Sequence, residues 1–132
     1  MLQIILAVAA GSAVGGTLRY VVALLLPTAV GRWPWPTLLV NLIGCFLLGL
    51  LSGWFSRYEP SPALRAFLTI GVCGGFTTFS SFINEDFQLF RSGQLLSAVA
   101  YPAVSFVLGL LLLILGYRLM EGLSLFLLES ER

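Results

Sequence analysis

The most informative stretch of this sequence is Gly71-Val72-Cys73-Gly74-Gly75-Phe76-Thr77-Thr78-Phe79-Ser80-Ser81-Phe82. It lies inside a long apolar segment, yet it contains three glycines, four hydroxyl side chains and three phenylalanines. Hydrocarbon tolerates polar side chains and non-helical backbone only where protein or a water-filled cavity surrounds them. We therefore interpret the stretch as the functional part of a membrane-embedded chain.

The composition around this stretch is typical of an integral membrane protein. Hydrophobic residues make up 58% of the 132 residues and charged residues only 10%, whereas roughly a quarter of a soluble domain is charged. Apolar runs of about 18 residues or more indicate membrane spans, and four are visible, at approximately residues 2–26, 37–55, 63–90 and 95–120. We expect an all-α membrane protein in which residues 1–132 form one domain of four transmembrane helices.

The same composition argues against an enzyme and against a nucleic-acid partner. The chain has no histidine, its two cysteines, Cys45 and Cys73, are isolated, and its net charge is only +1. The adjacent carboxylates Glu85 and Asp86 would point about 100° apart on a helix, which is a poor arrangement for acid–base catalysis.

The basic residues, all of them arginines, divide almost evenly between the two sides of the membrane. With four spans, both termini lie on one side. That side carries Arg57, Arg65, Arg118 and Arg132, and the other carries Arg19, Arg32 and Arg91. Cytoplasmic loops normally carry a clear excess of Lys and Arg. Two interpretations therefore remain open: a modest preference for cytoplasmic termini, or insertion in both orientations with pairing between inverted copies.

Small residues in the first two spans predict close helix packing. Gly11 and Gly15, and likewise Gly49 and Gly53, are four residues apart, a spacing that lets helix backbones approach closely. Arg19 lies several residues inside the first span. It either extends toward the membrane surface or faces a wet vestibule, where it would attract anions.

Trp33 and Trp35 lie in the proline-rich connection that follows the first span. Tryptophan is enriched at the level of the lipid headgroups, so we expect both residues to be interfacial anchors without a further role.

The third span is predicted to break near its middle. It is longer than the roughly 20 residues needed to cross a bilayer. Gly71, Gly74 and Gly75 weaken its helix next to Thr77 and Thr78, whose hydroxyls offer alternative hydrogen bonds. Unwound backbone carbonyls at mid-membrane are a recurrent way of binding a small cation.

Most of the remaining polar groups are hydrogen-bond donors. They are Asn41, Thr77, Thr78, Ser80, Ser81, Tyr101 and Ser105. Phe79 and Phe82, three apart on one helical face, add ring edges that carry partial positive charge. Such donors can replace the hydration of a small anion, and weak binding by ring edges lets the anion leave again. The residues alone indicate an anion pathway and do not name the anion.

A family resemblance is carried by the motif Gly-Gly-Phe-Thr-Thr-Phe-Ser-Ser-Phe at residues 74–82. With Asn41 in the second span, Arg19 in the first, and Tyr101 and Ser105 in the fourth, it resembles the Fluc (CrcB) family of bacterial fluoride channels. The resemblance covers essentially the whole chain.

The family resemblance implies an antiparallel, dual-topology homodimer in the bacterial inner (cell) membrane. Two fluoride pores would run along the subunit interface, and backbone carbonyls of Gly74 and Thr77 would hold a structural sodium ion at its centre. The implied partners are fluoride, membrane lipid and a second copy of the chain in inverted orientation.

The resemblance also assigns roles within the pore. The pore-lining residues would be Asn41, Thr78, Phe79, Ser81, Phe82, Tyr101 and Ser105. Among them, ring edges of Phe79 and Phe82 would contact fluoride and Asn41 would donate a hydrogen bond to it. Arg19 would lie in a vestibule at the pore entrance.

Two other functions fit a small four-span chain. A dual-topology multidrug exporter would need a carboxylate inside an early span, and residues 2–26 and 37–55 contain none. A membrane interaction module without transport activity would need only the close glycine contacts. The favoured hypothesis is a passive fluoride channel that lowers cytoplasmic fluoride.

Overall fold

The computed structural model describes residues 1–29 and 31–130, and every regular element within these ranges is helical. The elements are α1 (Leu2–Leu25), α2 (Trp35–Phe55), α3 (Pro62–Ala66), the π-helix η1 (Phe67–Cys73), α4 (Gly74–Phe76), α5 (Ser80–Arg91) and α6 (Leu95–Ser130). Four helical segments, with residues 62–91 taken together, are long and apolar enough to cross a membrane. The expected all-helical, four-span architecture is confirmed, while Arg132 of the arginine count lies outside the described residues.

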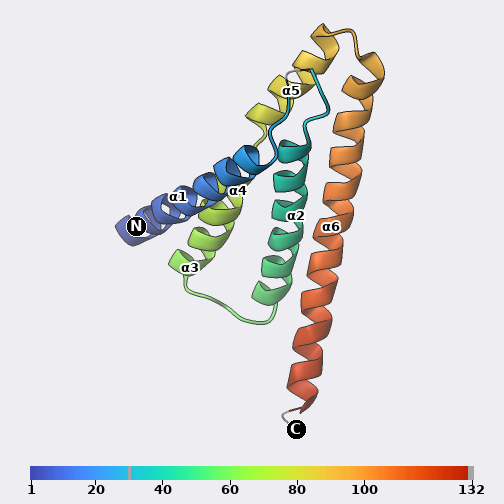
Figure 1. The fold of residues 1–132 in the computed structure, drawn as a ribbon. Coiled ribbons are helices and arrows are strands. Elements are labelled where there is room, and N and C mark those ends of the chain that lie inside the picture. The colour runs from blue at the N-terminus through green and yellow to red at the C-terminus, as the bar shows by residue number, and fades with distance from the viewer. Residues whose placement is uncertain (30, 131–132) are drawn as a thin grey trace.

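Two pairs of segments make up the fold. In Figure 1, α2 and α6 run side by side, while α1 crosses over the segment formed by α3, η1 and α4. α5 leaves this second pair and packs on the first part of α6. The chain between α4 and α5 therefore passes from one pair to the other.

The helix boundaries follow local sequence signals. α2 begins at Trp35 and has Pro36 in its first turn, where the missing N–H of proline is not needed. Ser61 caps α3, because its Oγ accepts from the amide of Leu64 at 3.2 Å. Gly93, with φ 78°, forms the turn between α5 and α6. α6 passes through Pro102 and continues to Ser130, beyond the expected end of the span near residue 120.

Two glycines of the third span, Gly71 and Gly75, pack against α1 and do not break the helix. Gly71 and Gly75 lie in helical segments, so the prediction that glycines unwind this region is wrong. A Cβ at Gly71 would lie 2.8 Å from the Cα of Gly11, and one at Gly75 would lie 2.9 Å from the carbonyl oxygen of Ser12. Here the absence of a side chain serves backbone contact, as expected for Gly11 and Gly15 in α1.

The helical conformation instead stops at Phe76 and resumes at Ser80. Thr77 is extended, with φ −81° and ψ 162°. The interruption thus falls on the threonines that follow the glycines, because Gly71 and Gly75 are held in the helix by their contacts with α1.

The second helix pair uses the same kind of contact. A Cβ at Gly49 would lie 2.1 Å from the carbonyl oxygen of Leu113, and one at Gly116 would lie 2.4 Å from that of Phe46. The backbones of α2 and α6 therefore touch, and this confirms the close packing predicted for Gly49.

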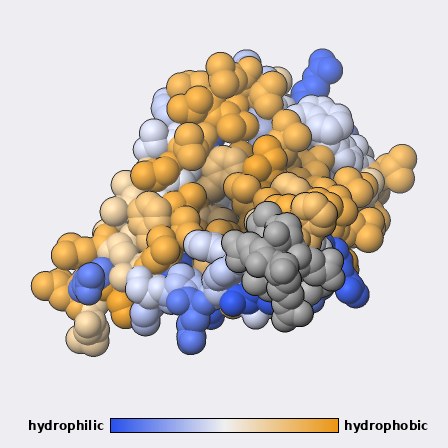
Figure 2. Space-filling model, turned by 90° about the horizontal axis from the view of Figure 1, so that it is seen from below, coloured by the Kyte–Doolittle hydropathy of each residue, from blue (hydrophilic) through white to orange (hydrophobic). Residues whose placement is uncertain are grey.

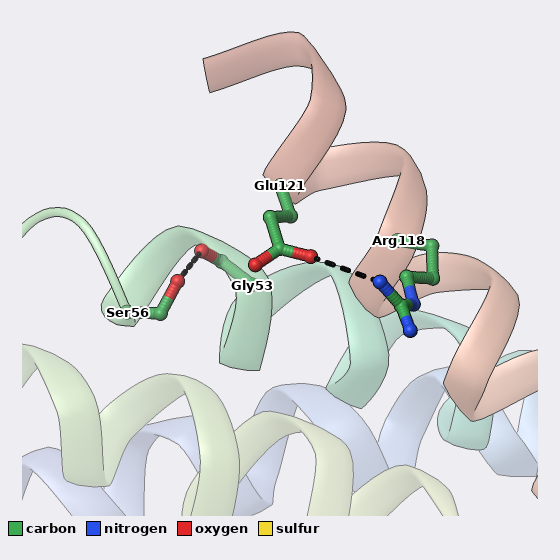
Figure 3. Close-up of polar contacts among 4 residues, drawn as sticks. All are labelled: Gly53, Ser56, Arg118 and Glu121. Atoms are coloured by element: carbon green, nitrogen blue, oxygen red, sulfur yellow. Dashed lines mark hydrogen bonds and ion pairs between the residues drawn. The ribbon is translucent and has the colours of Figure 1, made fainter. Parts of the chain in front are cut away.

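The surface is largely apolar, as Figure 2 shows for the end where the C-terminus lies. Polar contacts collect at this end of the α2–α6 pair (Figure 3). There Ser56 Oγ donates to the Gly53 carbonyl at 2.7 Å, and Arg118 Nη1 lies 3.7 Å from Glu121 Oε2. Charged groups at a helix end beside an apolar surface are typical of a membrane boundary.

The contact between α1 and the third span gives the first prediction. Replacing Gly15 by Ala places a Cβ 2.2 Å from the carbonyl oxygen of Val72. Because backbone atoms cannot move aside cheaply, we expect a loss of about 1–3 kcal/mol, seen as a lower unfolding midpoint in detergent. The control is Gly16→Ala, since a Cβ there meets nothing within 4 Å. Equal midpoints for the two variants would contradict the packing.

Candidate functional site

A cavity of about 530 Å³ opens on one face of the molecule, between α2, the third span and α6; we call it the central groove. Seven residues that the sequence analysis singled out line it: Asn41, Gly74, Thr77, Thr78, Phe79, Phe82 and Ser105. Cys45 and Cys73, interpreted as packing residues, also lie on its wall. The interrupted segment between α4 and α5 therefore faces a hollow lined by α2, η1, α4, α5 and α6.

The amide side chain of Asn41 holds the interruption. Its Nδ2 donates to the Thr78 carbonyl at 3.0 Å, and its Oδ1 accepts from the Thr78 amide at 2.8 Å. In a continuous α-helix the Thr78 amide would donate to the carbonyl of Gly74. Because the Thr78 amide donates to Asn41 Oδ1 instead, the Gly74 carbonyl lacks its usual helical donor.

A second diversion follows within the same turn. The amide of Ser81, which a continuous helix would direct to the Thr77 carbonyl, donates to Thr78 Oγ1 at 3.3 Å. Thr78 Oγ1 in turn donates to Ser81 Oγ at 3.1 Å. The carbonyls of Gly74 and Thr77 are therefore both separated from the amides that would satisfy them in a helix.

α2 leaves room for this segment at a single glycine. A Cβ at Gly44 would lie 2.1 Å from Thr77 Cγ2. Thr77 also bonds back to the helix it leaves, because its Oγ1 donates to the Cys73 carbonyl at 3.0 Å. Sequence reasoning missed Gly44, since only the contact across the bundle shows why its lack of a side chain matters.

The two phenylalanines differ in their surroundings. Phe79 is 76% exposed, whereas Phe82 is half-buried and packs against Tyr101, with ring centroids 4.9 Å apart. The Phe79 and Phe82 rings are 6.0 Å apart and tilted by 31°. Phe79 and Phe82 therefore lie next to each other, as predicted. Phe79 is open to the groove, and Phe82 packs against the buried Tyr101.

Tyr101, predicted to line the pore, is fully buried (0% exposed) and does not reach the central groove. Its hydroxyl donates to Glu85 Oε2 at 3.1 Å, and Thr37 Oγ1 donates to Glu85 Oε1 at 2.6 Å. From the sequence, Glu85 stands out only as a poor catalytic partner for Asp86. Its spacing of three residues from Phe82, on the same face of α5, is the signal that would have found it.

The remaining predicted residues lie at the edges of this site. Ser105 lines the central groove, and its Oγ is buried without a hydrogen-bond partner in the described structure. Ser81 is exposed beside Thr78. Arg19 is half-buried on α1 and does not line the groove.

The chemistry of the groove is that of neutral donors and carbonyl oxygens. Within the described residues, no three His, Cys, Asp or Glu side chains form a group that could hold a metal ion. A cation at this site would be held by backbone oxygens, and an anion by amide, hydroxyl and ring-edge groups.

The grip of Asn41 on Thr78 gives the second prediction. In Asn41→Ala the Thr78 amide loses its acceptor, so we expect faster hydrogen–deuterium exchange across residues 76–82. The control is Asn84→Ala, because Asn84 is exposed on α5. Unchanged exchange in Asn41→Ala would show that Asn41 does not hold the interruption.

Comparison with known proteins places this geometry in a family. The family model for CrcB-like protein, Camphor Resistance (CrcB), matches residues 6–117. The fluoride-specific ion channel FluC 1 of Nitrobacter hamburgensis is 41% identical over 121 residues, which cover 90% of this chain and 96% of the relative. The fluoride-specific ion channel FluC of Chlorobium phaeobacteroides is 46% identical over 116 residues, covering 87% and 91% of the two chains. That of Chloroflexus aurantiacus is 44% identical over 117 residues, covering 87% and 93%. The chain therefore belongs to the CrcB family, whose relatives named here are ion channels and not enzymes.

Proposed function

We propose that the protein is a fluoride-selective channel that lets fluoride leave the cytoplasm passively and so limits its toxicity. The observation that carries this proposal is the central groove, which gathers neutral donors and ring edges from α2, the third span and α6 on one open face. The names of the relatives, which are fluoride-specific ion channels, support the choice of anion.

The donors that remain free set the selectivity. Asn41 Nδ2 uses one N–H on Thr78 and keeps a second, because an amide nitrogen carries two. Ser105 Oγ has no partner. Fluoride is small and strongly hydrated, so it needs several hydrogen bonds to replace its water, and a neutral lining avoids the tight binding that would block conduction.

A second copy in inverted orientation completes the pore in this proposal. The groove is open along one side, and Phe79 is 76% exposed within it. The even division of arginines between the two sides of the membrane supports a chain that inserts both ways. Two copies related in this way would enclose two pores in the bacterial inner membrane.

Near the axis between the copies, the break in the third span would hold a structural sodium ion. The carbonyls of Gly74 and Thr77 fit such an ion, because their helical donors are diverted to Asn41 and to Thr78. Two such oxygens from each copy would provide a ring of carbonyl ligands at mid-membrane. The ion would supply charge and rigidity at the interface.

Arg19 and Tyr101 act at a distance from the groove in this proposal. Arg19, on α1, would raise the local anion concentration in a vestibule. Tyr101 would support Phe82 from behind, since their ring centroids are 4.9 Å apart, and would contribute its hydroxyl only if the bond to Glu85 opened.

Ion efflux from proteoliposomes tests the proposed function. Vesicles loaded with potassium fluoride and reconstituted with the purified chain should release fluoride rapidly in the presence of valinomycin, and vesicles loaded with chloride should retain it. Fluoride efflux should not depend on a proton gradient, which separates a channel from a proton-coupled exporter. Equal release of chloride would contradict the selectivity.

Variants of the exposed and inward rings test the ring-edge contacts. Phe79→Ile and Phe82→Ile keep an apolar side chain and remove the positive ring edge, so both should lower fluoride efflux. Phe126→Ile is the matched control, because Phe126 is exposed at the far end of α6. Unchanged efflux in both pore variants would rule out ring edges as part of the pathway.

A further inference from the structure

We infer that the indole N–H of Trp33 binds fluoride at the end of the conduction pathway, an inference that rests on the proposed function. The sequence analysis treated Trp33 as an interfacial anchor, and the structure gives it a different environment. Three observations carry the inference: an unpartnered buried donor, a continuous row of aromatic rings that leads to it, and a second unpartnered donor further along that row.

Trp33 Nε1 is buried and has no hydrogen-bond partner among the residues that the structure describes. An indole nitrogen only donates, and a buried donor without an acceptor destabilises the folded chain. A tryptophan that anchors a protein in the membrane interface exposes its N–H to water and lipid carbonyls, which a covered nitrogen cannot reach. The described residues offer one unpartnered buried acceptor, Asp86 Oδ1; in this inference the acceptor at Trp33 is instead a small mobile anion.

An aromatic row connects Trp33 with the central groove. Phe79 and Phe82 are 6.0 Å apart, Phe82 and Tyr101 4.9 Å, and Tyr101 and Trp33 5.7 Å between ring centroids. The last pair meets edge to face, with an interplanar angle of 75°. The pathway proposed along Phe79 and Phe82 thus continues past Tyr101 to the connection between α1 and α2.

A second free donor occupies this row. Ser105, one turn along α6 from Tyr101, also carries a buried oxygen without a partner. The donors between them are already used, because Tyr101 and Thr37 both donate to Glu85. Free donors therefore lie on either side of the pair that Glu85 already occupies.

The indole resonances of the intact wild-type chain test this inference directly. With 15N-labelled tryptophan in nanodiscs, the three tryptophans, Trp33, Trp35 and Trp54, give three indole N–H signals. Sodium fluoride should shift the Trp33 signal in a saturable way, and sodium chloride at the same concentration should not. The Trp54 signal, from the opposite end of α2, should stay unchanged.

Trp33→Phe then tests the consequence for transport. The variant keeps an aromatic ring against Tyr101 and removes the donor together with part of the indole's volume. Since hydrogen bonds to charged groups are worth about 1.5–3 kcal/mol, we expect fluoride efflux at low fluoride concentration to fall about tenfold or more. Trp54→Phe, which loses an indole outside the row, should conduct like wild type.

The outcomes separate this inference from the proposed function. A wild-type chain that conducts fluoride but shows no shift of the Trp33 signal overturns the inference and leaves the channel intact. A Trp33 signal that shifts in Asp86→Asn, and does not shift on adding fluoride, assigns the N–H to the Asp86 carboxylate and also overturns the inference. Absence of fluoride efflux from the wild-type chain contradicts the proposed function itself.

Discussion

The paired hydrogen bonds between Asn41 and the backbone of Thr78 are the constraint on which the rest of the site depends. A polar group in an apolar bundle must be satisfied, and here one amide side chain satisfies both an amide and a carbonyl that leave the helix. The bond connects α2 to the third span, so it fixes the interruption in space as well as in sequence. Every other feature of the groove is positioned relative to it.

Glycine contacts hold the two sides of this interruption. Gly71 and Gly75 place the helical part of the third span directly on the backbone of α1, and Gly44 admits Thr77 beside α2. These contacts are rigid because backbone atoms meet backbone atoms or a short side chain. The interruption is therefore a defined turn between two fixed helices, which is what an ion pathway with precise distances requires.

Much of this fold could be predicted from the sequence, and the reasons for the errors are physical. Length and hydropathy locate four spans because hydrocarbon admits few other solutions. The position of the interruption could not be predicted from Gly71 and Gly75, since a glycine that frees the backbone and one that admits a neighbouring helix look the same in one dimension. Likewise, Asn41 is visible as a polar residue in a span, but its partner depends on how α2 meets the third span.

The burial of Tyr101 shows why a list of donors does not define an anion pathway. A hydroxyl that already donates to a carboxylate is unavailable to an anion, and the carboxylate repels that anion. Glu85 takes up the hydroxyls of Thr37 and Tyr101, while Ser105 and Trp33 carry donors without acceptors. The sequence distinguishes donors from acceptors, but only the structure shows which donors already have an acceptor within the protein. In the proposed channel, selectivity for a small anion would therefore depend on which donors have no acceptor within the protein.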